Sequence, residues 1–165
     1  MSNKQKGSNA ERELVKLFTS HGWRAVRVAG SGVGEDSPCD LIAAKAKRKG
    51  FTIEAKSGTS TSLPVPADQI ERCMSWIKTF DVYKEKNVIL AFKFLSKKRI
   101  GIGKYESREL REFFKIWDNE LDITNCVCSY DGKIFVKKNG VKEELHLKEC
   151  IMPFKTKQRS SAKLK

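Results

Sequence analysis

The sequence has 165 residues, of which 39% are hydrophobic, and these values fit a single globular domain with one ordinary core. Lysine and arginine number 33 against 20 acidic residues, so the net charge of +13 favours a polyanionic partner, above all nucleic acid, over simple solubility. The chain has no apolar run long enough to span a membrane, and its polar N-terminus is untypical of a secretory signal. We therefore expect a cytoplasmic protein without a membrane partner.

The first half of the chain predicts alternating helices and strands. Ser8 or Asn9 is a suitable N-cap for the first helix, and Gly22 lies just past its end. A turn is expected around Lys49–Gly50, and a glycine-rich loop over residues 30–38. The other predicted elements are a helix over 9–20, strands over 23–29, 39–47 and 51–57, a polar loop over 57–66, a helix over 67–80 and a buried strand over 87–95.

The second half gives weaker patterns. Residues 99–105 suggest a partner for the buried strand, 107–117 a helix, and 126–138 a hairpin around Asp131–Gly132. Residues 141–151 fit either a helix or a strand. We predict one α/β domain over 1–154 with a central mixed sheet flanked by helices, followed by a basic, disordered tail over 155–165.

The cysteines give no sign of a disulfide framework or a zinc site. Their number is odd, five, and their spacing is irregular. Cys126 and Cys128 form a C-x-C pair inside an alternating segment, which is not a zinc-ligand spacing. Reduced, structural thiols are the simplest interpretation.

One group of residues could carry chemistry. Asp40 opens a predicted strand, while Glu54 and Lys56 lie two residues apart on the next strand and therefore project to the same face. If the two strands pair, Asp40 reaches the same place, and two carboxylates beside a lysine form a site suited to Mg²⁺. Glu11, on the polar side of the first helix, could add a third carboxylate. Alone, E-x-K is more often a solvated ion-pair face.

Four short motifs in order make the pattern more specific. They are K-G-S-N-A-E-R-E-L at 6–14, R-V-A-G-S-G at 27–32, P-C-D-L-I-A at 38–43 and I-E-A-K at 53–56. Together they resemble the archaeal Holliday junction resolvases of the PD-(D/E)xK nuclease superfamily. The resemblance covers residues 6 to about 95. It implies a restriction-endonuclease-like fold and an endonuclease that resolves four-way DNA junctions in recombination and repair. It also implies activity as a homodimer with Mg²⁺, for which Mn²⁺ can substitute.

The resemblance assigns roles residue by residue. Glu11, Asp40 and Glu54 match the metal-site carboxylates, and Lys56 matches the catalytic lysine. Ser31 falls in a mobile loop that shapes the catalytic pocket. Arg12 and Arg27 match basic residues that hold the DNA backbone, and we expect Lys6 to contribute as well. Ser57 begins a run of Ser, Thr and Gly over 57–62, which could either donate hydrogen bonds to phosphate or simply form a solvated loop.

Some features depart from the family pattern and leave alternatives open. Cys39 separates Pro38 from Asp40, the stretch before Asp40 is longer than in the shortest family members, and the acidic pair at 35–36 offers another carboxylate near the metal. The role of residues 106–165 is undefined. Competing interpretations are a superfamily nuclease acting on linear duplex, a non-catalytic basic DNA-binding protein and, with less support, an RNA-binding module, which lacks the expected aromatic platform.

Overall fold

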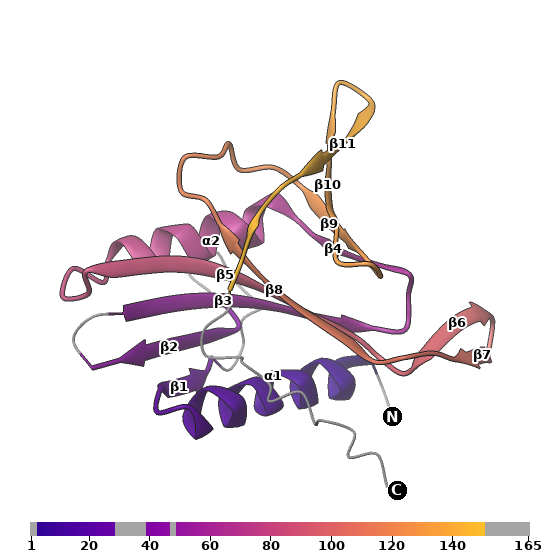
Figure 1. Ribbon diagram of the computed structural model, residues 1–165, viewed down its shortest axis with the longest axis horizontal. Coiled ribbons are helices and arrows are strands. Elements are labelled where there is room, and N and C mark those ends of the chain that lie inside the picture. The colour runs from indigo at the N-terminus through magenta and orange to yellow at the C-terminus, as the bar shows by residue number, and fades with distance from the viewer. Residues whose placement is uncertain (1–2, 29–38, 47–48, 151–165) are drawn as a thin grey trace, which may run out of the picture.

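A computed structural model describes residues 3–28, 39–46 and 49–150 of the chain. Among these residues, six strands form a main sheet in the order β1-β2-β3-β5-β8-β12 (Figure 1). The sheet is mixed, because β3 and β5 run parallel while the other neighbours run antiparallel. Its strands are β1 (Arg24–Arg27), β2 (Leu41–Lys45), β3 (Lys49–Gly58), β5 (Glu85–Phe94), β8 (Arg111–Trp117) and β12 (Lys148–Glu149). The expected α/β class with a central mixed sheet is confirmed.

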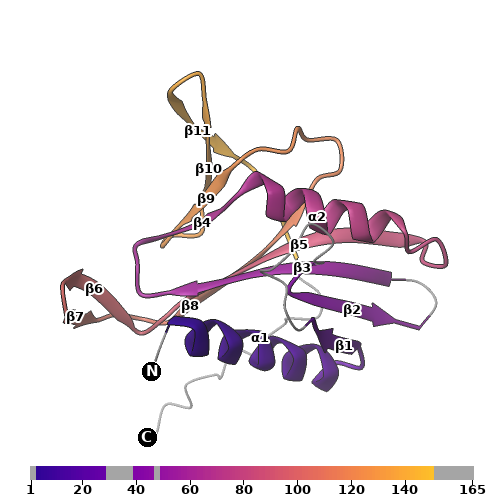
Figure 2. The same cartoon turned by 180° about the vertical axis from the view of Figure 1, so that it is seen from behind.

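The described helices α1 (Asn3–Ser20) and α2 (Ala67–Lys78) lie on opposite faces of this sheet (Figures 1 and 2). Alternate residues of β3 therefore point to opposite faces of the sheet, one covered by α1 and the other by α2. Phe51 and Ile53 pack in the cluster that contains α1. Thr52 points to the other face, where its hydroxyl donates to the carbonyl of Cys73 on α2 at 2.9 Å. Even-numbered residues of β3 thus face α2, and odd-numbered residues face α1.

The first helix begins earlier than predicted. It starts at Asn3, so Ser8 and Asn9 lie inside it and neither is its N-cap. Its end agrees with the prediction, because Gly22 adopts a φ of 79° and the Trp23 amide donates back to the Phe18 carbonyl at 3.1 Å. Helix α2 matches its predicted range closely and buries Ile70, Cys73, Met74 and Ile77 as its spacing requires.

The predicted turn at Lys49–Gly50 is wrong, because both residues belong to β3, opposite Lys45 and Ala44. Gly50 serves another purpose. A side chain there would meet the ring of Tyr83 at 3.0 Å, so glycine permits close packing of the loop after α2 against the sheet. The polar loop expected over 57–66 is also partly a strand, β4 (Ser62–Val65).

Residues 111–117 form strand β8 and not the predicted helix. Their apolar residues fit a helical period, but β8 pairs along β5 from Val88↔Trp117 to Phe94↔Arg111 and satisfies the free edge of that strand. Residues 99–105 do not pair with β5. They contribute instead to a separate ribbon of β6 (Lys97–Gly101) and β7 (Lys104–Ser107).

A second sheet within the described ranges has the order β11-β10-β9-β4. It adds β9 (Cys126–Ser129), β10 (Ile134–Lys138) and β11 (Val141–Leu145). The hairpin predicted around Asp131–Gly132 is confirmed, with Gly132 at a φ of 85°. The sequence leaves the segment 141–151 open between helix and strand, and its described part, 141–150, contains the strands β11 and β12. Trp117, Cys126, Cys128 and Ile134 join the core beneath α2, so this sheet shares that core.

The remaining expectations concern thiols, membranes and two segments. All five cysteines lie in the described ranges, and each is a buried, free thiol. Within the same ranges, neither helix is long and apolar enough to cross a bilayer. The loop over 30–38 and the tail over 155–165 lie outside the described residues, as do Ser31 and the acidic pair at 35–36.

Candidate active site

The first carboxylate of the candidate site is fixed by the sheet itself. Strand β2 begins at Leu41, opposite Ile53 of β3, so Asp40 lies just before β2 starts, where β3 continues past that end of β2. The Ala55 amide donates to Asp40 Oδ2 at 2.9 Å, which holds the carboxylate against the backbone of β3. The position of Asp40 therefore depends on the pairing of two strands and not on a flexible loop.

Glu54 and Lys56 project from β3 toward the α2 face, as their spacing predicts. Lys56 Nζ donates to Glu54 Oε1 at 2.7 Å. Glu54 is 4% exposed, and few carboxylates are buried this deeply without a strong partner. The side chain of Lys56 remains 23% exposed, so its ammonium group lies between the buried carboxylate and solvent.

Burial and the nearby charge of Asp40 raise the pKa of Glu54 from 4.5 to about 7. Lys56 and Arg72 act in the opposite direction but do not cancel these effects. The site thus holds two neighbouring carboxylates with too little positive charge to ionise the buried one fully at neutral pH. A divalent cation would relieve this repulsion, and carboxylate oxygens are suitable ligands for such an ion. Asp40 and Glu54 therefore fit a divalent metal.

Arg72 of α2 was not singled out by the sequence. Its positive charge lowers the pKa of Glu54, and its Nη2 also lies 3.5 Å from Asp68 Oδ2 one turn earlier on the helix. The sequence places it only on the helix surface beside Cys73, and no spacing rule links it to the strand residues. Its proximity to the site results from the packing of α2 on β3.

Glu11 does not join Asp40 and Glu54. It forms an ion pair with Arg27 of β1, and Arg27 shares the α1 face of the sheet with Ala25. Among the residues that the structure describes, no three acidic, histidine or cysteine side chains come together to hold a metal. The structure thus brings together two of the three predicted carboxylates and the lysine.

The predicted DNA-binding residues are dispersed. Arg12 lies on α1, where its Nη1 donates to Asn9 Oδ1 at 3.3 Å, and Arg27 is engaged by Glu11. Lys6 belongs to α1, but its side chain lies outside the described part of the chain. Ser57 directly follows Lys56, and its hydroxyl is buried with no hydrogen-bond partner among the described residues.

Ser57 lies at one end of a polar groove beside β3. The groove has a volume of about 590 Å³ and extends along residues 57–64 to Arg99 and Tyr105 of the β6–β7 ribbon. Hydroxyl groups and backbone from the run of Ser, Thr and Gly form one wall. A chain of hydroxyl donors next to Lys56 is suited to phosphate oxygens.

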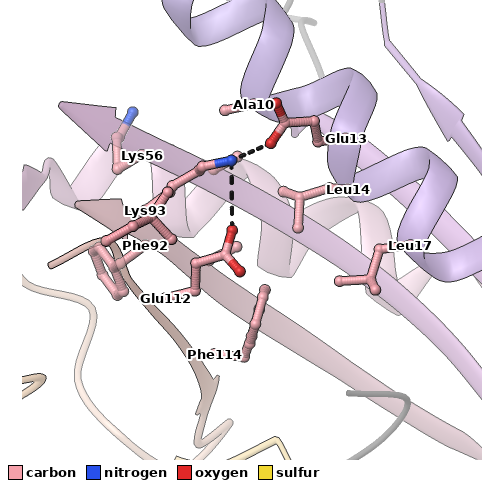
Figure 3. A pocket seen from close by; sticks show the side chains of 12 residues that line it. Ala10, Glu13, Leu14, Leu17, Lys56, Phe92, Lys93, Glu112 and Phe114 are labelled. Atoms are coloured by element: carbon pink, nitrogen blue, oxygen red, sulfur yellow. Dashed lines mark hydrogen bonds and ion pairs between the residues drawn. The ribbon is translucent and has the colours of Figure 1, made fainter. Parts of the chain in front are cut away.

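A second hollow of about 300 Å³ lies between α1 and strands β5 and β8 (Figure 3). There the ammonium group of Lys93 forms an ion pair with Glu13 and lies 3.6 Å from Glu112. Figure 3 shows the end of Lys56 turned away from this ion cluster. The charges in this hollow already compensate one another, so it offers no cation site comparable to Asp40 and Glu54.

Comparison with known families decides the assignment of the chain. The model of the family described as archaeal Holliday junction resolvase (Hjc) matches residues 2–113, about two thirds of the sequence. The chain belongs to this resolvase family. The matched range includes Glu11, Asp40, Glu54 and Lys56, and it ends within β8, so most of the second sheet lies beyond it.

Two relatives illustrate the family. The crossover junction endodeoxyribonuclease Hjc of Archaeoglobus fulgidus is 29% identical over 139 residues, which cover 84% of this chain and 98% of the relative. The enzyme Hje of Sulfolobus acidocaldarius is 27% identical over 125 residues, covering 76% and 86% respectively. The solved structure of Archaeoglobus fulgidus Hjc matches with a TM-score of 0.47 and 23% identity, over 65% of this chain and 71% of that one.

Membership of this nuclease family implies dependence on a divalent metal ion. The candidate site offers such an ion two adjacent carboxylates, one of them buried. The donor set and the family assignment therefore agree.

Proposed function

We propose that this resolvase cuts four-way DNA junctions by hydrolysing phosphodiester bonds, with Mg²⁺ as its usual metal and Mn²⁺ as a substitute. The observation that carries the proposal is the group formed by Asp40, Glu54 and Lys56 on two paired strands, inside a chain of the resolvase family. The net charge of +13 supports a polyanionic substrate.

Asp40 and Glu54 would hold the metal, which when bound lowers the pKa of a water molecule and polarises the phosphate. The hydrogen bond from Ala55 fixes Asp40, so this ligand is preorganised before DNA binds. Glu54 must lose its proton to act as a ligand, and the ammonium group of Lys56 stabilises the ionised form. Glu11 stays a predicted ligand that would reach the metal only after its ion pair with Arg27 opens.

Lys56 would act on the reacting phosphate. Its partly exposed ammonium group can orient the attacking water and offset negative charge in the transition state. The water oxygen forms a new bond to phosphorus while the bond to the 3′ oxygen breaks, which leaves a 5′-phosphate and a 3′-hydroxyl. The Ser57 hydroxyl could donate to a neighbouring phosphate oxygen from the polar groove.

The wider DNA contacts and the assembly are part of the same proposal. Arg12, Arg27 and Lys6 would contact backbone phosphates, so recognition should follow shape more than sequence. A two-fold homodimer would present two sites to a two-fold junction and cut a pair of strands of like polarity. Sedimentation of the chain alone and with a junction would test this assembly.

The central experiment compares a synthetic four-way junction with linear duplexes made from its arms, in Mg²⁺. We expect selective cutting of the junction, and Asp40→Asn should abolish cutting while junction binding persists. Asp81→Asn is a matched control, because Asp81 is 91% exposed in its side chain and remote from the site. Junction affinity should also fall steeply with salt, since phosphate contacts release counterions.

Three results would count against the proposal. Equal cutting of junction and linear duplex would replace the junction enzyme with a general DNA endonuclease. Undiminished cutting by the Asp40→Asn variant would show that the chemistry takes place elsewhere, and a chain that binds DNA without cutting it would be a binding protein.

A further inference from the structure

The β6–β7 ribbon protrudes from the molecule, and the site described above uses only its Arg99 and Tyr105, at one end of the polar groove (Figures 1 and 2). Its turn contains Gly103 at a φ of 68° and presents Ile102 with 94% of its surface exposed. Ile100 is 51% exposed on the adjoining strand. A single exposed aliphatic residue is ordinary, but two at the end of a projecting ribbon form an apolar tip.

Basic residues surround this tip. The ribbon carries four cations and one carboxylate, namely Lys97, Lys98, Arg99, Lys104 and Glu106. An apolar tip with a cationic surround is poorly suited to stand in water alone or to dock against another copy of this basic chain. This combination of charge and apolar surface suits nucleic acid, which offers phosphates along its backbone and apolar base faces where stacking is interrupted.

Hydrogen bonds join the base of the ribbon to the end of β3 and to the residues that follow it. The Arg99 amide donates to the Thr59 carbonyl at 2.9 Å. Arg108 follows the ribbon, and its guanidinium donates to the carbonyls of Leu95, Ser60 and Gly58 at 2.8, 3.0 and 3.2 Å. These bonds hold the ribbon in one orientation relative to the end of β3, so its tip is positioned before DNA arrives.

The tip is within reach of a DNA arm that occupies the active site. Lys56 pairs with Phe92, and Ile102 follows Phe92 by ten residues (92 to 102), which span at most about 33 Å of extended chain. That length equals about ten steps of stacked base pairs. The polar groove from Ser57 to Arg99 and Tyr105 lies between the two places.

We propose that the ribbon tip is a wedge for the branch point of the junction. Ile102 and Ile100 would pack against the base pairs where stacking is interrupted, while the ribbon cations hold the flanking phosphates. Proteins that kink DNA insert aliphatic side chains in this manner. The inference rests on the proposed function, because a linear duplex offers no open base face for the tip.

The test uses the full chain with Asp40→Asn, so that DNA stays intact, and a junction carrying 2-aminopurine at the branch point. Binding should raise the fluorescence of the base as it unstacks. Adding Ile102→Ser should remove most of this rise and weaken junction binding about tenfold, with linear-duplex binding unchanged. Val141→Ser is the matched control, because Val141 is also exposed, at 60%, but lies on β11.

The outcomes separate the two proposals. If the Asp40→Asn parent binds junction and linear duplex equally, the proposed function fails. If the parent prefers the junction but Ile102→Ser keeps the full fluorescence rise and affinity, only the wedge is refuted. A change in sedimentation caused by Ile102→Ser would also refute the wedge, because the tip would then contact a second copy of the chain.

Discussion

Replacing the buried carboxylate of Glu54 by an amide should stabilise the protein while abolishing cutting. The pKa of Glu54 is raised to about 7, chiefly by burial and then by Asp40, so the folded chain resists ionising this group. The unfolded chain ionises it near the ordinary value of 4.5. Wild-type stability is therefore lost as pH rises from about 4.5 through about 7, and Glu54→Gln escapes this loss.

The size of this stabilisation follows from the shift in the pKa of Glu54. A change of about two and a half pKa units at 1.36 kcal/mol each corresponds to about 3 kcal/mol of unfolding free energy above pH 7. Glu54 is 4% exposed, so solvent screening reduces this value little. Near pH 5 most of the cost of ionising Glu54 is absent, and the stability that Glu54→Gln gains over wild type should fall below about 1 kcal/mol. For a chain of this size, 1 kcal/mol shifts Tm by about 2 to 4 °C.

The assay is urea unfolding of wild type and Glu54→Gln at pH 5 and pH 8, with EDTA present so that no cation offsets the repulsion. Glu143→Gln on β11 is the control, because Glu143 is exposed and should show no pH-dependent gain. Two results would refute the claim that ionised Glu54 destabilises the folded chain. One is a Glu54→Gln variant that is no more stable than wild type at pH 8, and the other is a variant that gains equally at both pH values.

Other perturbations test the metal site and the core. Because Glu54 must lose a proton to bind a cation, Ca²⁺ affinity measured by calorimetry should rise between pH 6 and pH 8; a constant affinity would contradict its role as a ligand. Ile134→Ala should cost about 2 to 5 kcal/mol in urea unfolding, and a loss under about 0.5 kcal/mol would separate the second sheet from the main core. Gly132→Ala should lower the free energy of unfolding by at least about 1 kcal/mol more than Gly140→Ala does. Both glycines have positive φ, but only a Cβ at Gly132 would meet the Phe113 ring, at 2.5 Å, and equal losses would contradict this clash.

Local patterns predicted the elements whose amphipathic spacing and tertiary packing agree. The apolar residues of α2 recur with a helical period, and the same four positions are buried in the structure. Glu54 and Lys56 share a face because alternation along a strand is a local property of the backbone. These features required no knowledge of distant contacts.

Long-range pairing overrode the local pattern elsewhere. Residues 111–117 have helical spacing, yet β5 needed a partner along its free edge, and β8 supplies it. Gly50 resembles a turn residue in sequence, but its lack of a side chain admits Tyr83 from a loop more than thirty residues away in the chain. Neither the pairing of β8 with β5 nor the packing of Tyr83 on Gly50 can be predicted from a short stretch of sequence.

The sequence by itself determined the residue types of the candidate site and the alternation that puts Glu54 beside Lys56. Only the tertiary structure decided which further groups meet them. It places Asp40 at β3 through strand pairing, brings Arg72 near Glu54 through helix packing, and leaves Glu11 with Arg27 on the other face. The reason is physical, because side-chain direction is set locally, whereas the pKa of a buried carboxylate depends on every charge that folding brings near it.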